Sequence, residues 1–251
     1  MTRFQTLYAV IFDLLGTLTR LEGEEERLLE QGIKEALAFL KEQGIRLPHA
    51  EFAEKYLEAL KFAARKSSLE QEEHLATDTL TFLLQFYDYP HVEPAIVQAA
   101  VDRVFAPWVK AQRLYPGVLD VMRRLRQRGL KVGILTNAQH DRAVRQVVAH
   151  LGLQEVVDLV VTSGEVAERP RKPNPAAWEP FWQAWDMLPY EAVMVGDDLV
   201  EDILGALNAQ MWTIWLKRQP AGSELERAIR PDATIARVEE VVDIIDRWEA
   251  V

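Results

Sequence analysis

The residues best suited to chemistry are polar side chains that follow short apolar runs or stand just before expected helices. They form four segments: Asp13 with Gly16 and Thr17, Thr136 with Asn137, Lys172, and Gly196 with Asp197, Asp198 and Asp202. A short apolar run bounded by turn-forming residues is typical of a buried strand. Because ligand crevices in parallel α/β sheets lie at the carboxyl ends of the strands, we expect these segments to meet at one edge of a sheet.

The four segments are chemically complementary. A carboxylate such as Asp13 can act as a nucleophile toward phosphorus or carbon. The Thr136 hydroxyl and nearby backbone amides can bind phosphoryl oxygens, and Lys172 can neutralise charge on the nucleophile and on the transferred group. Asp197 and a neighbouring acid offer the oxygen ligands that Mg²⁺ prefers.

Each segment by itself also has an ordinary structural explanation. A lone Asp or a Thr-Asn pair after a strand commonly caps a helix or forms a turn. A lysine before a proline is usually at the surface, and Asp197 and Asp198 fit a solvated loop. For any one segment we favour that explanation. All four in this order, each at a strand end or a loop, are better explained by a shared site.

The elements that must position these residues alternate between strands and helices over most of the chain. Strands are expected at 8–12, 130–136, 156–162, 192–196, 211–216 and 233–235. Helices are expected at 118–128, 138–151, 174–187, 200–209 and 238–249. This alternation indicates a parallel sheet wound by right-handed crossovers. The predicted class is therefore an α/β protein with a Rossmann-like core.

A purely helical stretch separates the first strand from the others. Helices are predicted at 22–43, 48–65, 69–87 and 92–109, with a break at Ser67 and Ser68 and no strand between 20 and 110. Because strands stand on both sides of it, this bundle-like unit of four helices is inserted into the sheet domain. We predict a core domain of residues 1–18 and 113–251 and a helical cap domain of residues 19–112.

The composition is that of an ordinary globular protein and argues against several classes of function. The net charge of −10 disfavours a nucleic-acid or anionic-membrane partner, because both need a basic surface. Cysteine is absent, which rules out disulfides, thiolate catalysis and cysteine metal sites. No apolar stretch is long enough for a membrane span, and Met1-Thr2-Arg3-Phe4 leads straight into the first strand without a signal peptide. We expect a cytoplasmic protein.

Four stretches of the chain resemble the four sequence motifs of the haloacid dehalogenase-like (HAD) hydrolase superfamily. They are Phe12-Asp13-Leu14-Leu15-Gly16-Thr17-Leu18, Leu135-Thr136-Asn137, Lys172-Pro173-Asn174-Pro175 and the run from Val195 to Ala206. Tyr115-Pro116-Gly117 is similar to the segment with which such chains re-enter the core after a helical (C1-type) cap, and Pro231-Asp232 also fits. The resemblance covers nearly the whole core domain, and the cap only in position and helicity. It indicates a superfamily and no particular substrate.

The resemblance implies a role for each matching residue. Asp13 matches the nucleophile that forms an aspartyl intermediate, and Lys172 matches the lysine that steadies it and the transferring group. Thr136 and Asn137 match the phosphate-binding pair, with Lys172 contributing. The matching Mg²⁺ ligands are Asp13, the backbone carbonyl of Leu15, Asp197 and Asp202. The resemblance thus implies a Mg²⁺-dependent phosphatase that acts on a small phosphorylated metabolite.

Leu15 departs from the phosphatases of this family, which carry a second Asp at that position. In them that Asp protonates the leaving oxygen and then activates water, and general acid–base help is worth roughly 10²–10⁴ in rate. Leu15 can do neither, so we expect slow turnover or a restriction to substrates with good leaving groups. The family also has members with an aromatic residue (dehalogenases), alanine (phosphonatases) or threonine (ion-pumping ATPases) there.

Two alternatives to the phosphatase hypothesis follow from Leu15. The chain could be a degenerate HAD protein that binds a phosphorylated ligand or a partner without turnover. It could also be a 2-haloacid dehalogenase, which needs a cationic halide cradle for which Arg20 and Arg27 are near in sequence. A phosphonatase would instead need a cap lysine, with four candidates by location: Lys34, Lys41, Lys55 and Lys61. Surface charge is the simpler explanation for all six. The sequence leaves the oligomeric state open.

Overall fold

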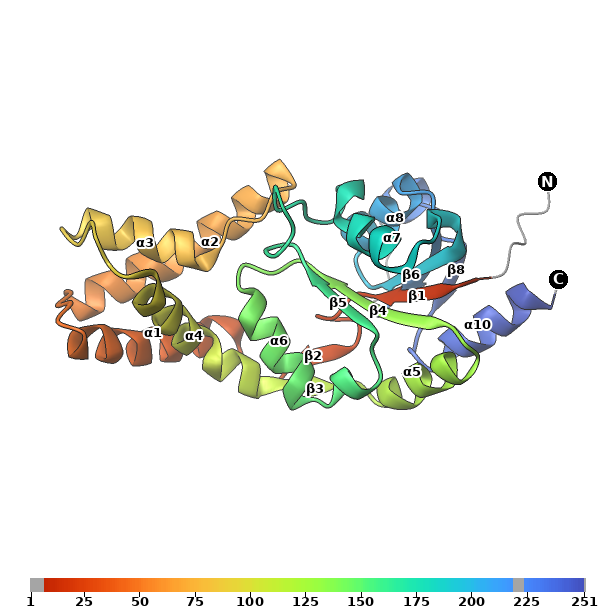
Figure 1. Ribbon diagram of the computed structural model, residues 1–251, viewed down its shortest axis with the longest axis horizontal. Helices are drawn as coiled ribbons and strands as arrows, with labels where there is room; N and C mark the ends of the chain where they lie inside the picture. The colour runs from red at the N-terminus through yellow and green to blue at the C-terminus, as the bar shows by residue number, and fades with distance from the viewer. Residues whose placement is uncertain (1–6, 219–223, 251) are drawn as a thin grey trace.

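A parallel sheet of six strands runs through the described part of the chain, which in this computed structural model comprises residues 7–218 and 224–250 (Figure 1). The strands are β1 Ala9–Phe12, β4 Lys131–Thr136, β5 Leu159–Thr162, β6 Ala192–Gly196, β7 Trp212–Leu216 and β8 Ala233–Ile235. They lie in the order β5-β4-β1-β6-β7-β8, and every pairing is parallel. The predicted α/β class with a Rossmann-like sheet is confirmed. The stretch Met1–Phe4, where we expect no signal peptide, lies outside the described residues.

Helices cover both faces of the sheet, so β1 is buried on both sides (Figure 1). The helices on one face are α5 Val118–Gln127, α6 Asp141–His150 and α10 Glu240–Glu249, and those on the other are α7 Glu179–Trp185 and α8 Gly205–Asn208. Val10 and Phe12 belong to the apolar cluster of the first group, and Ala9 and Ile11 to that of the second. This alternation follows from the two-residue period of a strand. It fixes β1, and with it the residue that follows β1, from two sides.

The order of the strands reverses at β1. The chain places β4 and β5 on one side of β1, and β6, β7 and β8 on the other. A reversal of this kind opens a crevice at the carboxyl ends of the strands. Asp13 follows β1, Asn137 follows β4 and Asp197 follows β6. These three residues therefore start from the same edge of the sheet.

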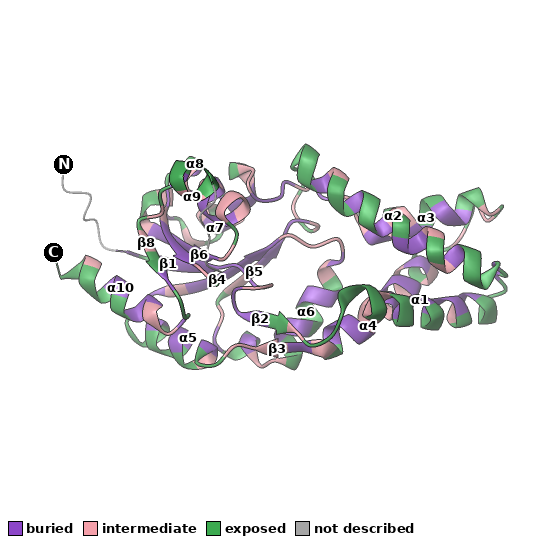
Figure 2. Ribbon diagram, turned by 180° about the vertical axis from the view of Figure 1, so that it is seen from behind, coloured by how far each residue is buried: buried purple, intermediate pink, exposed green. Residues whose placement is uncertain are grey.

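The chain between β1 and β4 contains four helices that pack on one another. They are α1 Glu25–Glu42, α2 His49–Glu70, α3 Ala76–Phe86 and α4 Pro94–Ala111. Figure 2 shows buried faces turned inward and exposed faces turned outward. These helices share an apolar cluster of their own, which includes Ile33, Phe52, Leu80 and Val101. That separate core supports a cap domain at 19–112, whose boundaries stay a prediction. None of the described helices combines the length and the apolar character that a membrane span needs.

The expectation of no strand between 20 and 110 was wrong. Strand β2, Thr19–Leu21, pairs antiparallel with β3, Gln112–Leu114, where the chain leaves the core and returns to it. The partners are about ninety residues apart in sequence, so no local pattern reveals the pairing. This two-stranded ribbon joins the four helices to the sheet.

The expected helix break at Ser67 and Ser68 was also wrong. Helix α2 continues to Glu70 and ends at Gln71, whose backbone is left-handed. The Ser67 hydroxyl donates to the Ala63 carbonyl within the helix and accepts from the His74 backbone N–H of the following loop. Serine tolerates a helix when its hydroxyl bonds the carbonyl four residues earlier. Here the same hydroxyl also fixes the loop.

Several other elements are shorter or less regular than expected. Strand β5 begins at Leu159, because Val156 closes the 3₁₀ turn η1, Leu153–Glu155. The helix expected at 174–187 begins as the 3₁₀ turn η2, Pro175–Trp178, before α7. The helix expected at 200–209 is a π-helix, η4 Leu199–Leu204, followed by α8. The remaining elements are η3 Pro189–Glu191 and α9 Glu224–Ala228.

Gly32 should be essential to the packing of α1 on α4. A Cβ added there would overlap the backbone carbonyl of Val104 on α4. Alanine gains about 1 kcal/mol in helix propensity over glycine, yet we expect Gly32→Ala to lower the free energy of unfolding by about 1–3 kcal/mol, because the helices must separate. Urea unfolding followed by circular dichroism measures this. Gln31→Ala, an exposed position on the same helix, should change it by less than about 0.5 kcal/mol, and equal effects at both positions would contradict the packing argument.

Candidate active site

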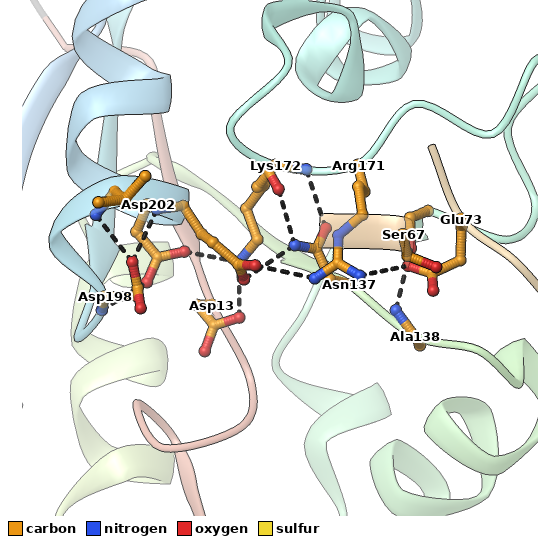
Figure 3. A network of polar contacts seen from close by, with 12 residues as sticks. Asp13, Ser67, Glu73, Asn137, Ala138, Arg171, Lys172, Asp198 and Asp202 are labelled. Atoms are coloured by element: carbon orange, nitrogen blue, oxygen red, sulfur yellow. Dashed lines mark hydrogen bonds and ion pairs between the residues drawn. The ribbon is translucent and has the colours of Figure 1, made fainter. Parts of the chain in front are cut away.

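Lys172 lies between two buried carboxylates at the edge of the sheet (Figure 3). Its Nζ donates to Asp13 Oδ1 at 2.7 Å and to Asp202 Oδ1 at 2.6 Å. Asp13 follows β1, where its backbone N–H donates to the Val195 carbonyl of β6. All three side chains are almost inaccessible to water. In such surroundings these charge-assisted hydrogen bonds are stronger than they would be in water.

Asp197 completes a cluster of three carboxylates. One oxygen from each of Asp13, Asp197 and Asp202 lies within 4.8 Å of the others. The Thr17 hydroxyl donates to Asp197 Oδ1 at 2.8 Å. Two glycines permit this crowding: a Cβ at Gly16 would lie 2.6 Å from Asp197 Oδ2, and a Cβ at Gly196 would overlap the Asp202 carboxylate. The side chains predicted from the sequence as metal ligands therefore meet at one point.

These carboxylates fit a divalent cation. Asp13 Oδ2 is buried and has no hydrogen-bond partner among the residues that the structure describes. Three carboxylates face one ammonium group, so the cluster keeps an excess of negative charge. Oxygen donors of this kind are the ligands that Mg²⁺ takes. Asp13, Asp197 and Asp202 could hold it, with the Leu15 carbonyl at the start of the same turn.

Burial and mutual repulsion alter the pKa values of these groups. Burial raises the pKa of Asp13 above its ordinary value, although Lys172 opposes the shift. Burial also raises the pKa of Asp202 to about 7, and the Asp13 charge adds to this. Partial burial raises the pKa of Asp197. Burial alone would lower the pKa of Lys172, but the charges of Asp13 and Asp202 outweigh it and raise that pKa. The lysine therefore stays charged at neutral pH.

Asn137 positions Lys172 through its side chain. Its Oδ1 accepts from the Lys172 backbone N–H at 2.9 Å, and its Nδ2 donates to the Lys172 carbonyl at 3.0 Å and to Glu201 Oε2 at 2.9 Å. The amide group is thus committed to the protein, and any contact of Asn137 with a phosphoryl oxygen falls to its backbone. Thr136 is buried at the end of β4, directly before Asn137.

The π-helix η4 delivers acids to both sides of the lysine segment. Asp198 caps it, and its Oδ1 accepts from the backbone N–H groups of Val200 and Glu201 at 2.7 Å each. Asp198 is therefore a helix-capping residue, whereas the ordinary explanation from the sequence placed it in a solvated loop. Asp202 points to Lys172, while Glu201 Oε1 accepts from Arg171 Nη2 at 2.8 Å. The wider turn of a π-helix is frequent at functional sites.

A cavity of about 190 Å³ adjoins the site between the cap helices and the core. Leu15 lines it together with Phe105 and Trp108 of α4, which give the cavity apolar lining. Asn137, His140, Arg171 and the cap residue Glu73 give it polar lining as well. His140 Nε2 lies 2.8 Å from Asp102 Oδ1 on α4, so the cap and the core also touch at its rim. Leu15, two residues after Asp13 in the chain, thus contributes an apolar side chain to this cavity.

The basic residues considered for other chemistries lie elsewhere. Arg20 and Arg27 are exposed and pair with Glu22 and Glu24. The cap lysines also belong to the surface: Lys34 and Lys41 are exposed, and Lys55 and Lys61 pair with Glu51 and Glu26. None of these six residues lines the cavity beside Leu15.

Some contacts of the site were not predicted. Arg171 and Glu201 are next to motif residues, and polar side chains beside Lys172 and Asp202 could have indicated them. Arg218 follows β7, and its guanidinium donates to the carbonyls of Gly16 and Thr17 at 2.7 and 2.8 Å while it stacks on Tyr115. A polar residue at a strand end was the available signal for Arg218. Glu73 comes from the cap, and no feature of the sequence around it indicated a contact with the site.

Lys172 should dominate the stability of this cluster. Removing one partner of a buried ion pair costs about 3–5 kcal/mol. We therefore expect Lys172→Met to lower the free energy of unfolding by about that much at pH 8. Without the ammonium the pKa values of Asp13 and Asp202 in the folded state rise further above their unfolded values. Stability from such raised pKa values is present at low pH and lost as the pH increases. The loss should therefore be smaller at pH 5, as measured by urea unfolding at both pH values. Lys34→Met is the surface control, and a pH-independent loss would contradict the assignment.

Comparisons with known proteins agree with the motifs. A family model described as haloacid dehalogenase-like hydrolase matches residues 8–210. Glyceraldehyde 3-phosphate phosphatase of Pyrococcus furiosus is 30% identical over 136 residues, which span 54% of this chain and 55% of that protein. Ribulose-1,5-bisphosphate 5-phosphatase of Halopiger xanaduensis is 26% identical over 243 residues, 94% of this chain and 98% of that one.

The fold agrees as well. The crystal structure of a 2-haloacid dehalogenase from Pseudomonas syringae superposes with a TM-score of 0.69 at 21% identity, over 97% of this chain and 100% of that one. At that identity the likeness concerns the fold alone. The family match covers most of the chain and includes Asp13, Asn137, Lys172 and Asp202. The chain therefore belongs to the haloacid dehalogenase-like hydrolases.

Proposed function

We propose that this protein is a phosphatase that uses Asp13 to remove the phosphoryl group of a small phosphorylated metabolite. The observation that carries the proposal is the arrangement of Lys172 between Asp13 and Asp202, beside a third carboxylate and a cavity. The names of the two relatives described above, both phosphatases of phosphorylated sugars, support it.

Asp13 is the proposed nucleophile. Its carboxylate attacks phosphorus, the bond between phosphorus and the leaving oxygen breaks, and an aspartyl phosphate forms. Water then attacks this intermediate, which releases inorganic phosphate and regenerates the carboxylate. Lys172 keeps Asp13 oriented through its 2.7 Å hydrogen bond and offsets negative charge during both steps. Asn137 supports this role by holding the backbone of Lys172 on both sides.

Asp13, Asp197 and Asp202 are the proposed protein ligands of Mg²⁺, together with the Leu15 carbonyl. When bound, the cation would neutralise phosphoryl oxygens that the carboxylates alone would repel. The unpartnered Asp13 oxygen and the surplus of carboxylates over cationic groups support this assignment. The Thr17 hydroxyl orients Asp197, and the Asp198 N–H orients Asp202.

The cavity limits the leaving group. Its volume of about 190 Å³ is below the roughly 300–1,000 Å³ of typical ligand pockets, so it suits a short carbon chain. The apolar side chain of Leu15 has no proton to give to the departing oxygen. We therefore propose substrates whose leaving group is small and stable without immediate protonation. The cytoplasmic location and the lack of nucleic-acid or membrane partners stay predictions from the sequence.

The absence of an acid at position 15 also favours a second function. A protein that binds a phosphorylated ligand without turnover would keep the cradle of Lys172 and the carboxylates but would not need an acid–base residue. Carbon–halogen hydrolysis has less support, because a departing halide would meet three carboxylates, while Arg20 and Arg27 point to other partners.

Substitution of Leu15 distinguishes these functions. We expect purified protein to hydrolyse p-nitrophenyl phosphate with Mg²⁺, and Asp13→Asn to abolish this activity. Leu15→Asp supplies the missing acid–base group and should raise kcat for a phosphomonoester with a poor leaving group by about 10²-fold. Leu15→Asn is the matched control, because asparagine is polar but cannot act as a general acid or base, and it should not raise kcat. A wild type without turnover, together with an active Leu15→Asp variant, would favour the binding function.

Mg²⁺ binding should depend on pH through Asp202. Its pKa of about 7 in the folded, metal-free protein lies above the ordinary value, so the proton on Asp202 stabilises the fold at low pH and is lost as the pH rises through 7. Because the cation competes with that proton, its apparent affinity should be about tenfold lower at pH 6 than at pH 8. Calorimetric titration at both pH values measures this. Asp197→Asn should weaken binding strongly, whereas Asp120→Asn on the exposed face of α5 should not; pH-independent affinity would contradict the assignment of Asp202.

A further inference from the structure

The loop between α2 and α3 of the cap pairs with the core segment that leads to Lys172. The Glu73 backbone N–H donates to the Arg169 carbonyl at 2.8 Å, and the Arg171 N–H donates to the Gln71 carbonyl at 3.2 Å. Between these two bonds, Glu72 and Pro170 form an antiparallel bridge. The cap loop thus holds residues 169–171 as a neighbouring strand would, and Lys172 is the next residue.

The Glu73 side chain carries a charge into this contact. Only 1% of Glu73 is exposed. Its Oε2 accepts from the Ser163 hydroxyl at 2.7 Å and lies 3.6 Å from Arg171 Nη1. The same hydroxyl accepts from the Ala138 backbone N–H at 2.9 Å. Burial of a carboxylate is costly unless it is paired, so Glu73 draws together the two core segments that flank the site, 136–138 and 171–172.

A continuous set of polar contacts connects Glu73 to the proposed nucleophile (Figure 3). Arg171 donates to one Glu201 oxygen at 2.8 Å, and Asn137 donates to the other at 2.9 Å. Asn137 in turn holds both backbone polar groups of Lys172, whose Nζ contacts Asp13. Every step after Glu73 is a hydrogen bond of 3.0 Å or less. A shift of the cap loop would therefore also displace the Lys172 ammonium group.

The contact between Glu73 and Arg171 is incomplete on both sides. Glu73 Oε1 and Arg171 Nε are buried, and neither has a hydrogen-bond partner within residues 7–218 and 224–250. At 3.6 Å the pair is also longer than a charge-assisted hydrogen bond of about 2.7–2.9 Å. Both residues line the cavity beside Leu15. The pair is longer than a close ion pair, whereas the hydrogen bonds that lead from Arg171 through Glu201 and Asn137 to Lys172 are already short.

We propose that Glu73 is a positioning residue through which the docked cap sets the placement of Lys172 on Asp13. Its effect on catalysis rests on the proposed phosphatase function. Glu73 acts through Arg171 and the segment 169–171, and the helical insertion thereby becomes part of the catalytic apparatus. A misplacement of about 1 Å in a catalytic group can cost about 10² in rate, so loss of this contact should lower kcat more than it changes KM.

Glu73→Gln tests the proposal because it keeps the shape of the side chain and removes its charge. Glu72→Gln is the matched control, since Glu72 lies in the same loop with an exposed side chain. Hydrogen–deuterium exchange of residues 169–174 reports on the segment directly, without any need for turnover. We expect exchange there to become about tenfold faster in Glu73→Gln, equivalent to about 1.4 kcal/mol of lost protection. Glu72→Gln should exchange as the wild type does.

Steady-state hydrolysis of p-nitrophenyl phosphate with Mg²⁺ provides the second measurement. In Glu73→Gln we expect kcat to fall by about 10–100-fold while KM changes less than about threefold. Ser163→Ala, which removes one hydrogen-bond partner and leaves the Glu73 charge, should cause a smaller fall in the same direction, and it replaces Glu73→Gln should that variant not fold.

The outcomes are separable. Unchanged exchange at 169–174 in both Glu73→Gln and Ser163→Ala would overturn the coupling. A higher KM with unchanged kcat would overturn it too, because it indicates that Glu73 only docks the cap or binds substrate. A wild type without phosphatase activity would refute the proposed function, while the exchange measurement would still decide whether Glu73 holds the lysine segment.

Discussion

The contact of the Lys172 ammonium with two buried carboxylates is the interaction on which the site depends. Oxygens of Asp13, Asp197 and Asp202 lie within 4.8 Å of one another. Without a positive charge such as that of Lys172, their mutual repulsion would force these side chains apart or raise their pKa values until they bind protons. Lys172 reaches Asp13 and Asp202 at 2.7 and 2.6 Å because Asn137 fixes its backbone from both sides. A buried ion pair stabilises a protein only when its geometry is good, so the hold of Asn137 on the Lys172 backbone matters to the whole cluster.

The sheet provides that geometry because it brings the ends of three adjacent strands close together. Asp13, Asn137 and Asp197 leave three adjacent strands at the same edge, and Gly16 and Gly196 remove the Cβ atoms that would keep the carboxylates apart. Thr17 and the backbone of Asp198 then orient individual oxygens. The result is an anionic cradle whose oxygens are held by hydrogen bonds within the protein, and such preorganisation is what electrostatic catalysis requires.

The helical insertion and Leu15 together define the space above this cradle. Phe105 and Trp108 of α4 line a small cavity together with Leu15, and Glu73 and Arg171 add polar groups to its lining. An acid at position 15 would lie in a partly apolar wall, whereas leucine fits it by packing against the core. Leu15 thus lacks an acid–base group and suits the shape of the pocket, so the proposed phosphatase reaction would need a leaving group that is stable without protonation by this residue.

Much of the fold was accessible from sequence because it depends on local patterns. Apolar runs that end in polar residues, the alternation of strands and helices, and the helical stretch after Leu18 were sufficient to predict the parallel sheet and its insertion. The motif residues Asp13, Lys172, Asp197 and Asp202 were predicted to converge, and the structure brings them together. Spacing alone did not reveal that Asn137 serves the lysine, that Asp198 is a helix cap, or that Ser67 continues a helix.

The sequence by itself thus determined the class of fold, the family and the polar residues at the strand ends, because each of these is encoded in contiguous residues. The tertiary structure decided which groups those residues contact. The pairing of β2 with β3 and the contact of Glu73 with Ser163 and Arg171 join segments about ninety or more residues apart. Such contacts depend on how the cap docks on the sheet, and no local pattern of residue types carries that information.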